Sequence, residues 1–350
     1  MTVSRFHRNM YFRQMKFLRK LLFPFSLIYG GITYLRNRLY DMGWLKSHSY
    51  IIPIICVGNL STGGTGKSPM AEFLVSRLKD RYTLSVLSRG YKRKTKGFQE
   101  VFENSTVAEV GDEPLQFKRK FPEVKVAVCE RRSDGIEKLL PSSELIVLDD
   151  AFQHRKVNPS FSILLTSYGD LYVNDLVLPA GNLREPKTGA DRADILVVTK
   201  CPATLSQSEM DSIKIKLRPK PHQHIHFTKI VYSEQIENRS EKQSLRTLKN
   251  KNFTLVTGIA NPKPLVEFLK NHDLQFVHKS FSDHHHFTDS EIKDLDQEGI
   301  ILTTEKDYMR LQPFIKNVRL FYLPITISFL NDTADEFIRK IETSPFIQMK

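Results

Sequence analysis

The sequence predicts an α/β protein: a mostly parallel sheet with helices on both faces, a smaller C-terminal α/β domain and an N-terminal helix at a membrane interface. Over residues 51–199, short apolar runs rich in β-branched residues alternate with helical patterns. Such alternation is typical of parallel strands joined by crossover helices. A second alternation begins near residue 252. We therefore expect three parts, residues 1–48, 49–200 and 201–350.

The N-terminal part is basic and partly apolar. Residues 1–40 contain no acidic residue, and an uncharged segment, Leu21–Leu35, has cations on both sides. The segment is shorter than the ~20 residues that span a bilayer, and Pro24 interrupts it. We expect a helix lying in the membrane interface, with its cations against anionic headgroups. An amphipathic helix packed on the protein's own core is the alternative.

The next part opens on a glycine-rich loop. The apolar run Ile51–Val57 predicts a buried strand, and Met70–Leu78 predicts a helix. Glycines and a Lys-Ser pair lie between them, an order that indicates a phosphate-binding loop of the NTPase type. Lys67 would contact the β- and γ-phosphates of ATP, and the Ser68 hydroxyl would bind Mg²⁺. The strict pattern has glycine where Ser61 stands, so a plain glycine-rich turn is the alternative. The expected ATP-binding residues are Ser61, Thr62, Gly63, Gly64, Thr65, Gly66, Lys67 and Ser68.

Basic residues follow the next predicted strand, Tyr82–Leu87, and the motif SRGY. These residues are Lys92, Arg93, Lys94 and Lys96. Charge alone is consistent both with a solvated cationic loop and with a site for a substrate phosphate or a lipid headgroup.

Three acidic residues are candidates for the chemistry. Asp112 precedes a predicted helix, where it is either the N-cap or a catalytic base. Asp149 and Asp150 end the predicted strand Glu144–Leu148, and adjacent carboxylates at a strand end indicate a Mg²⁺ site. A pair of solvated loop aspartates is the alternative. Gln153 and His154 follow closely enough to line the same site.

Further strands are predicted at Phe161–Thr166 and Ala193–Thr199, the latter followed by Lys200. Residues 201–250 are polar and rich in Lys, Ser and Gln, and we expect them to cross between domains. The second α/β unit has predicted strands at 252–257, 274–277, 299–304 and 318–324 and a closing helix at 333–342. His284–His286 lie between two of these strands, and a catalytic or orienting histidine is one interpretation of them. A zinc site and an incidental surface loop are the alternatives.

Composition limits the class of protein. The chain has 350 residues and a net charge of +13, which favours an anionic partner. Cys56, Cys129 and Cys201 form no disulfide framework, which fits a reducing compartment. The basic runs lack interleaved aromatic residues and a nucleic-acid reading motif, so no nucleic-acid partner is expected. No obligate protein partner is expected either.

The motifs VGNLSTGGTGKSP, SRGY, GDEP, LDDAFQH, LPAGNLREP, FSDHHHFT and TTEKD occur in this order. Together they resemble the tetraacyldisaccharide 4'-kinases of lipid A synthesis, within the P-loop kinase superfamily. The resemblance extends from the basic N-terminus to the last fifty residues. Ala151 stands where that family commonly has glycine. The resemblance implies an ATP- and Mg²⁺-dependent transfer of the γ-phosphoryl group to the 4'-hydroxyl of a tetraacyldisaccharide 1-phosphate, forming lipid IVA.

The resemblance also implies residue roles and a location. Asp112 would activate the sugar hydroxyl with His284 as its partner, which favours the catalytic interpretation of Asp112 over the N-cap. Lys67, Asp149 and Asp150 would form the metal and catalytic centre. The implied site-lining residues are Tyr91, Arg132 (or Arg131), Gln153, His154, Arg184 and Glu185. The enzyme would be peripheral on the cytoplasmic face of the inner membrane of a Gram-negative bacterium. A P-loop GTPase or ATPase acting as a switch or chaperone, without a lipid substrate, is the alternative function.

Overall fold

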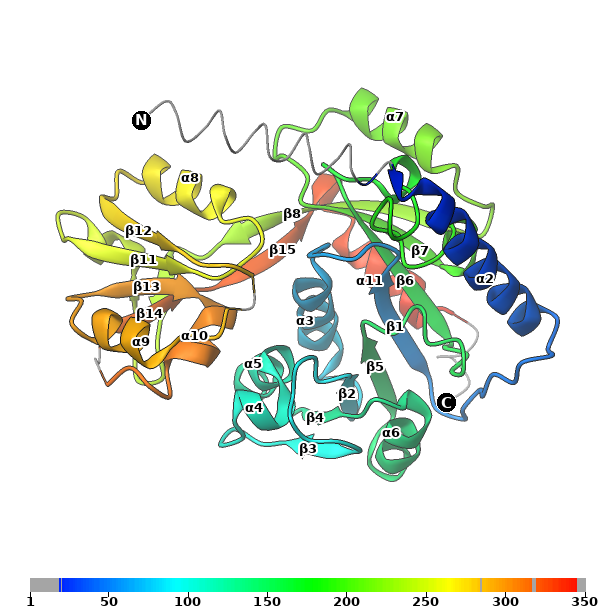
Figure 1. Cartoon of the computed structure of the whole chain (residues 1–350), viewed down its shortest axis with the longest axis horizontal. Helices are drawn as coiled ribbons and strands as arrows, with labels where there is room; N and C mark the ends of the chain where they lie inside the picture. The colour runs from blue at the N-terminus through cyan, green and yellow to red at the C-terminus, as the bar shows by residue number, and fades with distance from the viewer. Residues whose placement is uncertain (1–18, 20, 284, 317–318, 345–350) are drawn as a thin grey trace. The chain divides into compact units, whose positions relative to one another are not determined.

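The computed structural model describes residues 19, 21–283, 285–316 and 319–344. The chain forms two compact units, each assembled from separate stretches of sequence. The first unit contains the described residues up to Lys67, Leu145–Lys229 and the segment from Phe329 onward. The second unit contains Ser68–Glu144 and Ile230–Ser328. Figure 1 labels most of the helices and strands of both units. The three-part division expected from the sequence stays a prediction.

In the first unit, strands of the large sheet have the order β8-β7-β6-β1-β5. Around β1, all the neighbouring strands are parallel: β5 and β6 flank β1, β7 pairs with β6, and β8 pairs with β7. Strands β1, β5 and β7 are buried along their whole length, as expected for a parallel sheet covered on both faces. These strands are β1 (Ile54–Asn59), β5 (Leu145–Asp149), β6 (Phe161–Ser167), β7 (Ile195–Thr199) and β8 (His224–Tyr232), and β15 follows later in the chain (Ile325–Phe329).

Helices of the first unit are α2 (Phe23–Asp41), α7 (Gln207–Leu217) and α11 (Ala334–Glu342), with short 3₁₀ turns at Tyr172–Asn174, Lys187–Arg192 and Leu330–Asp332. Helix α2 is the expected N-terminal helix. In the part of the chain that the structure describes, no helix combines the length and apolar character needed to cross a bilayer.

The second unit carries two groups of elements. One group contains β2 (Leu84–Ser88) and β4 (Lys125–Val128), which are parallel, and β3 (Gln99–Val101), which is antiparallel to β4. Its helices are α3 (Lys67–Leu78, which begins at the last residue of the first unit), α4 (Val107–Val110), α5 (Asp112–Lys120) and α6 (Arg132–Leu139), followed by a 3₁₀ turn at Leu140–Ser142.

The other group is a six-stranded sheet with the order β10-β9-β14-β13-β11-β12. Strands β14, β13, β11 and β12 are parallel, and β9 and β10 extend the sheet in antiparallel fashion. Its core includes Leu255, Leu269 and Leu302, none of which is exposed to solvent. Its elements are β9 (Gln235–Glu237), β10 (Lys242–Ser244), a 3₁₀ turn (Leu245–Leu248), β11 (Phe253–Thr257), α8 (Lys263–Asn271), β12 (Phe276–Ser280), α9 (Asp289–Asp296), β13 (Ile301–Thr304), α10 (Glu305–Leu311) and β14 (Leu320–Leu323).

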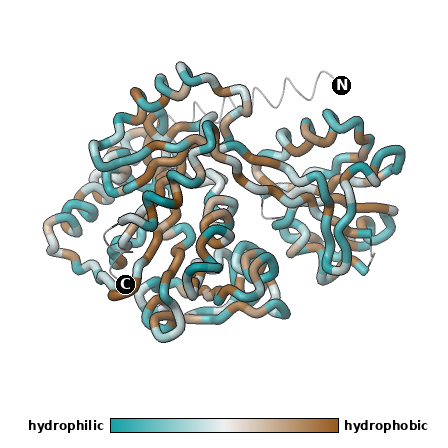
Figure 2. The backbone as a smooth tube through the Cα atoms, turned by 180° about the vertical axis from the view of Figure 1, so that it is seen from behind, coloured by the Kyte–Doolittle hydropathy of each residue, from teal (hydrophilic) through white to brown (hydrophobic). Residues whose placement is uncertain are grey.

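The predicted α/β class and the mostly parallel sheet are confirmed. Figure 2 shows the hydrophobic stretches of the chain in brown. Two local expectations were wrong. The first strand begins at Ile54, and Ile51 is fully exposed, because Pro53 immediately before the strand cannot donate to a sheet. The polar segment 201–250, for which no helix or strand was predicted, contains helix α7 and strand β8 of the large sheet. Beyond Pro324 lies one more strand, β15, so β14 is not the last.

Candidate active site

The glycine-rich loop connects β1 to α3 and is shaped by backbone conformations that favour glycine. Gly63 has φ +126° and Gly66 has φ +88°, values that side chains with a Cβ rarely adopt. The end of β7 holds the loop from the side: Thr199 Oγ1 donates to the Thr65 carbonyl at 2.7 Å, and the Lys200 ammonium donates to the Gly64 carbonyl. The loop therefore has the form of a phosphate cradle at the carboxyl ends of parallel strands.

Gly58, near the end of β1, allows the segment after β5 to approach β1 closely. A Cβ at this position would lie 2.5 Å from the Cβ of Phe152 and 3.1 Å from its backbone nitrogen. Only glycine permits this approach, which places the motif containing Asp150 and Gln153 directly beside β1.

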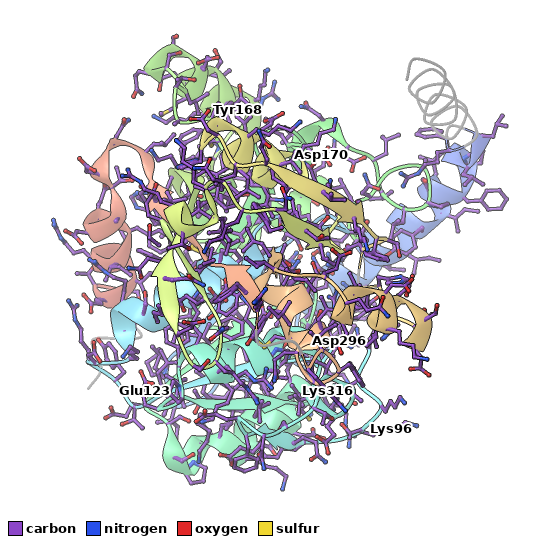
Figure 3. All side chains as sticks on the ribbon, turned by 90° about the vertical axis from the view of Figure 1, so that its left-hand side faces the viewer. Lys96, Glu123, Tyr168, Asp170, Asp296 and Lys316 are labelled. Carbon is purple, nitrogen blue, oxygen red and sulfur yellow. The ribbon has the colours of Figure 1, made fainter. Side chains whose placement is uncertain are left out.

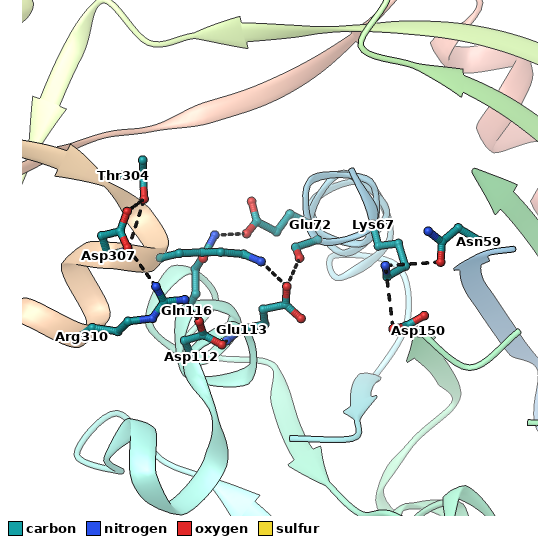
Figure 4. Close-up of polar contacts among 12 residues, drawn as sticks. Asn59, Lys67, Glu72, Asp112, Glu113, Gln116, Asp150, Thr304, Asp307 and Arg310 are labelled. Atoms are coloured by element: carbon teal, nitrogen blue, oxygen red, sulfur yellow. Dashed lines mark hydrogen bonds and ion pairs between the residues drawn. The ribbon is translucent and has the colours of Figure 1, made fainter. Parts of the chain in front are cut away.

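Lys67 is the first residue of α3, and its side chain is 13% exposed. Its Nζ lies 3.4 Å from Asn59 Oδ1 and 3.8 Å from Asp150 Oδ2 (Figure 4). Asp150 has φ +48°, an uncommon backbone conformation for a residue with a side chain. Asp149, the preceding residue, is buried at the end of β5. The predicted lysine and the predicted acidic pair therefore meet at one sheet edge.

Arg184, Gln153 and Glu185 extend this cluster. Arg184 Nη1 donates to Asp150 Oδ1 at 2.9 Å and to Gln153 Oε1 at 3.2 Å, and its Nη2 donates to Asp150 Oδ2 at 3.3 Å. Gln153 Nε2 donates to the Asn59 carbonyl at 2.8 Å and to Glu185 Oε1 at 3.1 Å. Glu185 is completely buried. These three predicted site-lining residues therefore form one network with the predicted metal ligand Asp150.

The side chains at this edge fit Mg²⁺ and a nucleotide triphosphate. Mg²⁺ in such sites is held by one or two carboxylates, a hydroxyl and the phosphates themselves, not by an all-protein cage. The described residues contain no group of three or more His, Cys, Asp or Glu side chains placed to hold a metal ion. Asp149 and Asp150 would supply the carboxylates, and the Lys67 ammonium would supply a cation for the phosphate oxygens.

Ser68, the predicted hydroxyl ligand, is engaged in the second unit. Its Oγ donates to Glu113 Oε1 at 3.1 Å, and the Lys306 ammonium donates to the same oxygen. Burial lowers the pKa of Lys306, but the carboxylates of Glu113 and Asp112 more than offset this, so its pKa lies above the ordinary value. Lys306 is therefore a permanent cation beside the start of α3.

Asp112, the predicted base, is the first residue of α5, and Gly111 is the N-cap. The N-cap interpretation of Asp112 is therefore wrong. Its Oδ1 accepts from the Glu113 backbone N–H at 3.0 Å, and its Oδ2 accepts from Arg310. Arg310 also donates to Asp307 at 2.9 Å. Burial raises the pKa of Asp307, although the Gly258 N–H and Arg310 oppose the shift. Two buried carboxylates thus share one guanidinium.

Other predicted residues lie in different environments. Tyr91 is 59% exposed. Arg132 is buried, with Nη1 donating to the Cys129 carbonyl at 2.6 Å, whereas Arg131 is an exposed partner of Asp134. His154 is half-buried two residues beyond Phe152. The roles of all of these in the site stay predictions.

In the basic loop, Lys96 points outward (Figure 3), but Arg93 pairs with Glu130 at 2.7 Å and its side chain is 2% exposed. Arg93 is therefore a structural residue, and only its neighbours are solvated.

His284 lies outside the described residues. His285, next to it, stacks on Phe281 and pairs with Glu291 at 2.9 Å.

Several residues that contact the predicted ones were not predicted from the sequence. Asn59 and Glu113 stand inside quoted motifs, and Lys306 and Asp307 belong to TTEKD, so their motifs were a usable signal. Arg310 lies three residues after Asp307, one turn on along α10, which is a weaker signal. Asn37, which donates to Glu185 from helix α2, has no local signal.

A glycine-rich cradle, a lysine at its helix start and an acidic pair at a neighbouring strand end define a nucleotide-binding protein of the phosphate-loop class. Residues 18–343 match the family model described as tetraacyldisaccharide-1-P 4'-kinase. A tetraacyldisaccharide 4'-kinase of Flavobacterium johnsoniae is 49% identical over 323 residues, 91% of this chain and 94% of the relative. One of Bacteroides thetaiotaomicron is 42% identical over 356 residues, 93% and 92% of the two chains.

A crystal structure of LpxK from Aquifex aeolicus in complex with ATP is also similar, with a TM-score of 0.75 at 32% identity. The match covers 93% of this chain and 99% of that one. The chain therefore belongs to the tetraacyldisaccharide-1-phosphate 4'-kinase family, and the family predicted from the motifs is confirmed. The kinase class is confirmed with it, and the switch or chaperone alternative is not favoured.

Proposed function

We propose that this chain transfers the γ-phosphoryl group of ATP to the 4'-hydroxyl of a tetraacyldisaccharide 1-phosphate, the lipid A disaccharide, to form lipid IVA. The observation that carries the proposal is the Lys67 ammonium, positioned between Asn59 and Asp150 at the end of a glycine-rich loop. A cation at this place neutralises phosphate oxygens, and charge compensation with positioning accounts for most of the catalysis of phosphoryl transfer.

In the reaction, the sugar O4' attacks the γ-phosphorus while the bond from that phosphorus to the β,γ-bridging oxygen breaks, leaving ADP. The hydroxyl proton goes to a carboxylate, and we assign this role to Asp112, with His284 as its partner. Lys67 holds the β- and γ-phosphates. When bound by Ser68, Asp149 and Asp150, Mg²⁺ would neutralise charge on the same phosphates. Tyr91, Arg132, His154 and the Arg184–Gln153–Glu185 network would contact or order the substrates.

The surface of helix α2 supports the proposal that the substrate is bound in a membrane. Its buried side chains are polar, namely Ser26, Thr33 and Asn37. Its apolar side chains face outward, where Phe25, Leu27, Ile28, Ile32 and Leu35 are each at least 58% exposed. This is the reverse of a helix packed on its own core, and it suits a surface that enters the acyl–headgroup boundary. We therefore propose a peripheral enzyme at the cytoplasmic face of the inner membrane, consistent with relatives from Gram-negative bacteria.

The kinase proposal is tested by incubating the full chain with labelled ATP, Mg²⁺ and tetraacyldisaccharide 1-phosphate in mixed micelles. The expected product is the labelled bisphosphate, with little ATP hydrolysis in micelles that lack the lipid. K67A should lower turnover by about 10²- to 10³-fold. K79A, which removes a surface partner of Glu123 from the same stretch of chain, is the matched control. Rapid nucleotide hydrolysis that ignores the lipid would favour the switch alternative.

The membrane proposal is tested with sedimented vesicles of anionic or zwitterionic lipid. The double variant I28E/I32E should remain in the supernatant, because two charges then face the bilayer. I215E changes an even more exposed isoleucine on α7 and should sediment as the wild type does. Recovery of I28E/I32E with the vesicles would exclude α2 as the contact surface.

A further inference from the structure

Asn37 connects the apolar-faced helix α2 to the cluster around Lys67. It is buried on the inner side of α2, and its Nδ2 donates to Glu185 Oε2 at 2.5 Å. Arg36 Nη2 donates to Asn37 Oδ1 at 3.0 Å. Because that oxygen accepts from a cation, the amide nitrogen is the end that faces Glu185.

The acceptor of this bond, Glu185, is completely buried and takes hydrogen bonds from three side chains. Asn37 occupies Oε2, while Gln153 at 3.1 Å and Arg192 at 2.9 Å occupy Oε1. A buried carboxylate requires such donors, and removal of one donor leaves one of its oxygens without that partner.

From Glu185 the contacts run without interruption to the phosphate loop. Gln153 bonds both Glu185 and the backbone of Asn59, and Arg184 bonds both Gln153 and Asp150. Asp150 then faces the Lys67 ammonium at 3.8 Å. Three side chains therefore connect Glu185 to Lys67, the lysine proposed to bind the phosphates. They are those of Gln153, Arg184 and Asp150.

Helix α2 also makes a second contact with the segment that contains Glu185. Tyr29 Oη donates to the Arg184 carbonyl at 2.8 Å, one residue before Glu185. The helix thus fixes both the backbone of Arg184 and the side chain of Glu185. A mere packing contact would not require a buried polar pair at this place, because apolar side chains pack without desolvation cost.

We propose that Asn37 is a positioning residue of the kinase. By holding Glu185, Asn37 fixes the side chains of Gln153 and Arg184, and these in turn position Asp150 and Lys67. Turnover therefore depends on the position of helix α2. The inference rests on the proposed phosphoryl transfer. If Asn37 has this role, the helix proposed to contact the membrane is structurally coupled to the phosphate loop.

The test measures kcat, the KM for ATP, the KM for the lipid and the unfolding temperature in mixed micelles. N37A should lower kcat by about tenfold or more, because one hydrogen bond to a buried charge is lost. S26A is the matched control: Ser26 is buried on the same face of α2 and accepts from the Ala180 N–H, but it has no contact with Glu185 among the described hydrogen bonds. S26A should keep kcat within about twofold.

A double-mutant cycle separates positioning from general loosening of the helix. If Asn37 acts through Gln153, N37A should add little further loss of kcat in a Q153A background. Losses that simply multiply, or an unchanged kcat in N37A, would overturn the proposal while leaving the kinase function intact. Absence of product with the wild-type chain would overturn both.

Two further variants cover the possibility that N37A does not fold. N37D has the same shape but places a second carboxylate against Glu185, so kcat should fall at least as far as in N37A. N37Q keeps the amide donor and should recover part of the lost kcat. Equal kcat for N37D and the wild type would also reject the role of Asn37.

Discussion

Arg310 donates a hydrogen bond to Asp112, a residue 198 positions earlier in the chain. The same guanidinium bonds Asp307, and both carboxylates are buried. The helix that begins with Asp112 is thereby tied to α10 of the six-stranded sheet, within one compact unit. The carboxylate assigned as the base is thus held in place by a residue that no motif identified.

The first prediction concerns this shared guanidinium. R310A would leave two buried carboxylates without their common cation, and it should lower the free energy of unfolding by about 3 kcal/mol. Urea unfolding followed by circular dichroism measures the change. R131A, which removes an exposed partner of Asp134, should change it by less than about 0.5 kcal/mol. Equal stability of R310A and wild type would show that the pair adds nothing.

The second prediction concerns the proposed base. D112N keeps the shape of the side chain but cannot accept the hydroxyl proton, so kcat should fall by about 10²- to 10⁴-fold. The KM for ATP should change little, because Asp112 is assigned no nucleotide contact. Steady-state kinetics at varied ATP provide the measurement, and D134N, at an exposed position on α6, is the control. A large loss of ATP affinity with normal turnover would contradict the assignment.

The third prediction concerns Gly58. G58A would force a Cβ to within 2.5 Å of Phe152 Cβ, so the segment carrying Asp150 and Gln153 must shift. We expect a destabilisation of about 1–3 kcal/mol and a loss of kinase activity. G169A is the matched control, because a Cβ there meets nothing within 4 Å. Normal activity and stability of G58A would mean that this close approach is not required.

The fourth prediction concerns pH. His226 is buried edge-on against Phe329 and Phe337, and burial lowers its pKa from 6.5 to about 4. The unfolded chain therefore binds a proton at this residue between pH 6.5 and 4 while the folded chain does not. The stability contributed by neutral His226 is complete above pH 6.5 and is lost as the pH falls toward 4.

Urea unfolding at pH 7.5, 6, 5 and 4.5 tests this dependence. H226Q cannot be protonated, so its stability should fall less steeply with acid than that of the wild type. H222Q, at an exposed histidine nearby in the sequence, should retain the wild-type slope. Identical slopes for H226Q and the wild type would contradict the buried, neutral state of His226.

Local patterns were sufficient for much of the fold and for part of the site. The runs around Val147 and Val197 are continuous and apolar because these strands are buried on both faces. The glycines, Lys67 and Asp150 are adjacent to strand ends, so their proximity at one sheet edge follows from parallel pairing. Strand β15 and helix α7 were missed because a short strand after a proline and a polar helix carry weak periodic signals.

The sequence by itself determined the α/β class, the phosphate loop and the family, because these depend on backbone conformation and on residues close together in the chain. Only the tertiary structure decided that Arg310 holds Asp112, that Glu113 and Lys306 engage Ser68, and that Asn37 reaches Glu185. The reason is physical: a buried charge takes whichever partner the folded chain brings within hydrogen-bond distance. That partner is set by packing between elements far apart in sequence, which no local pattern records.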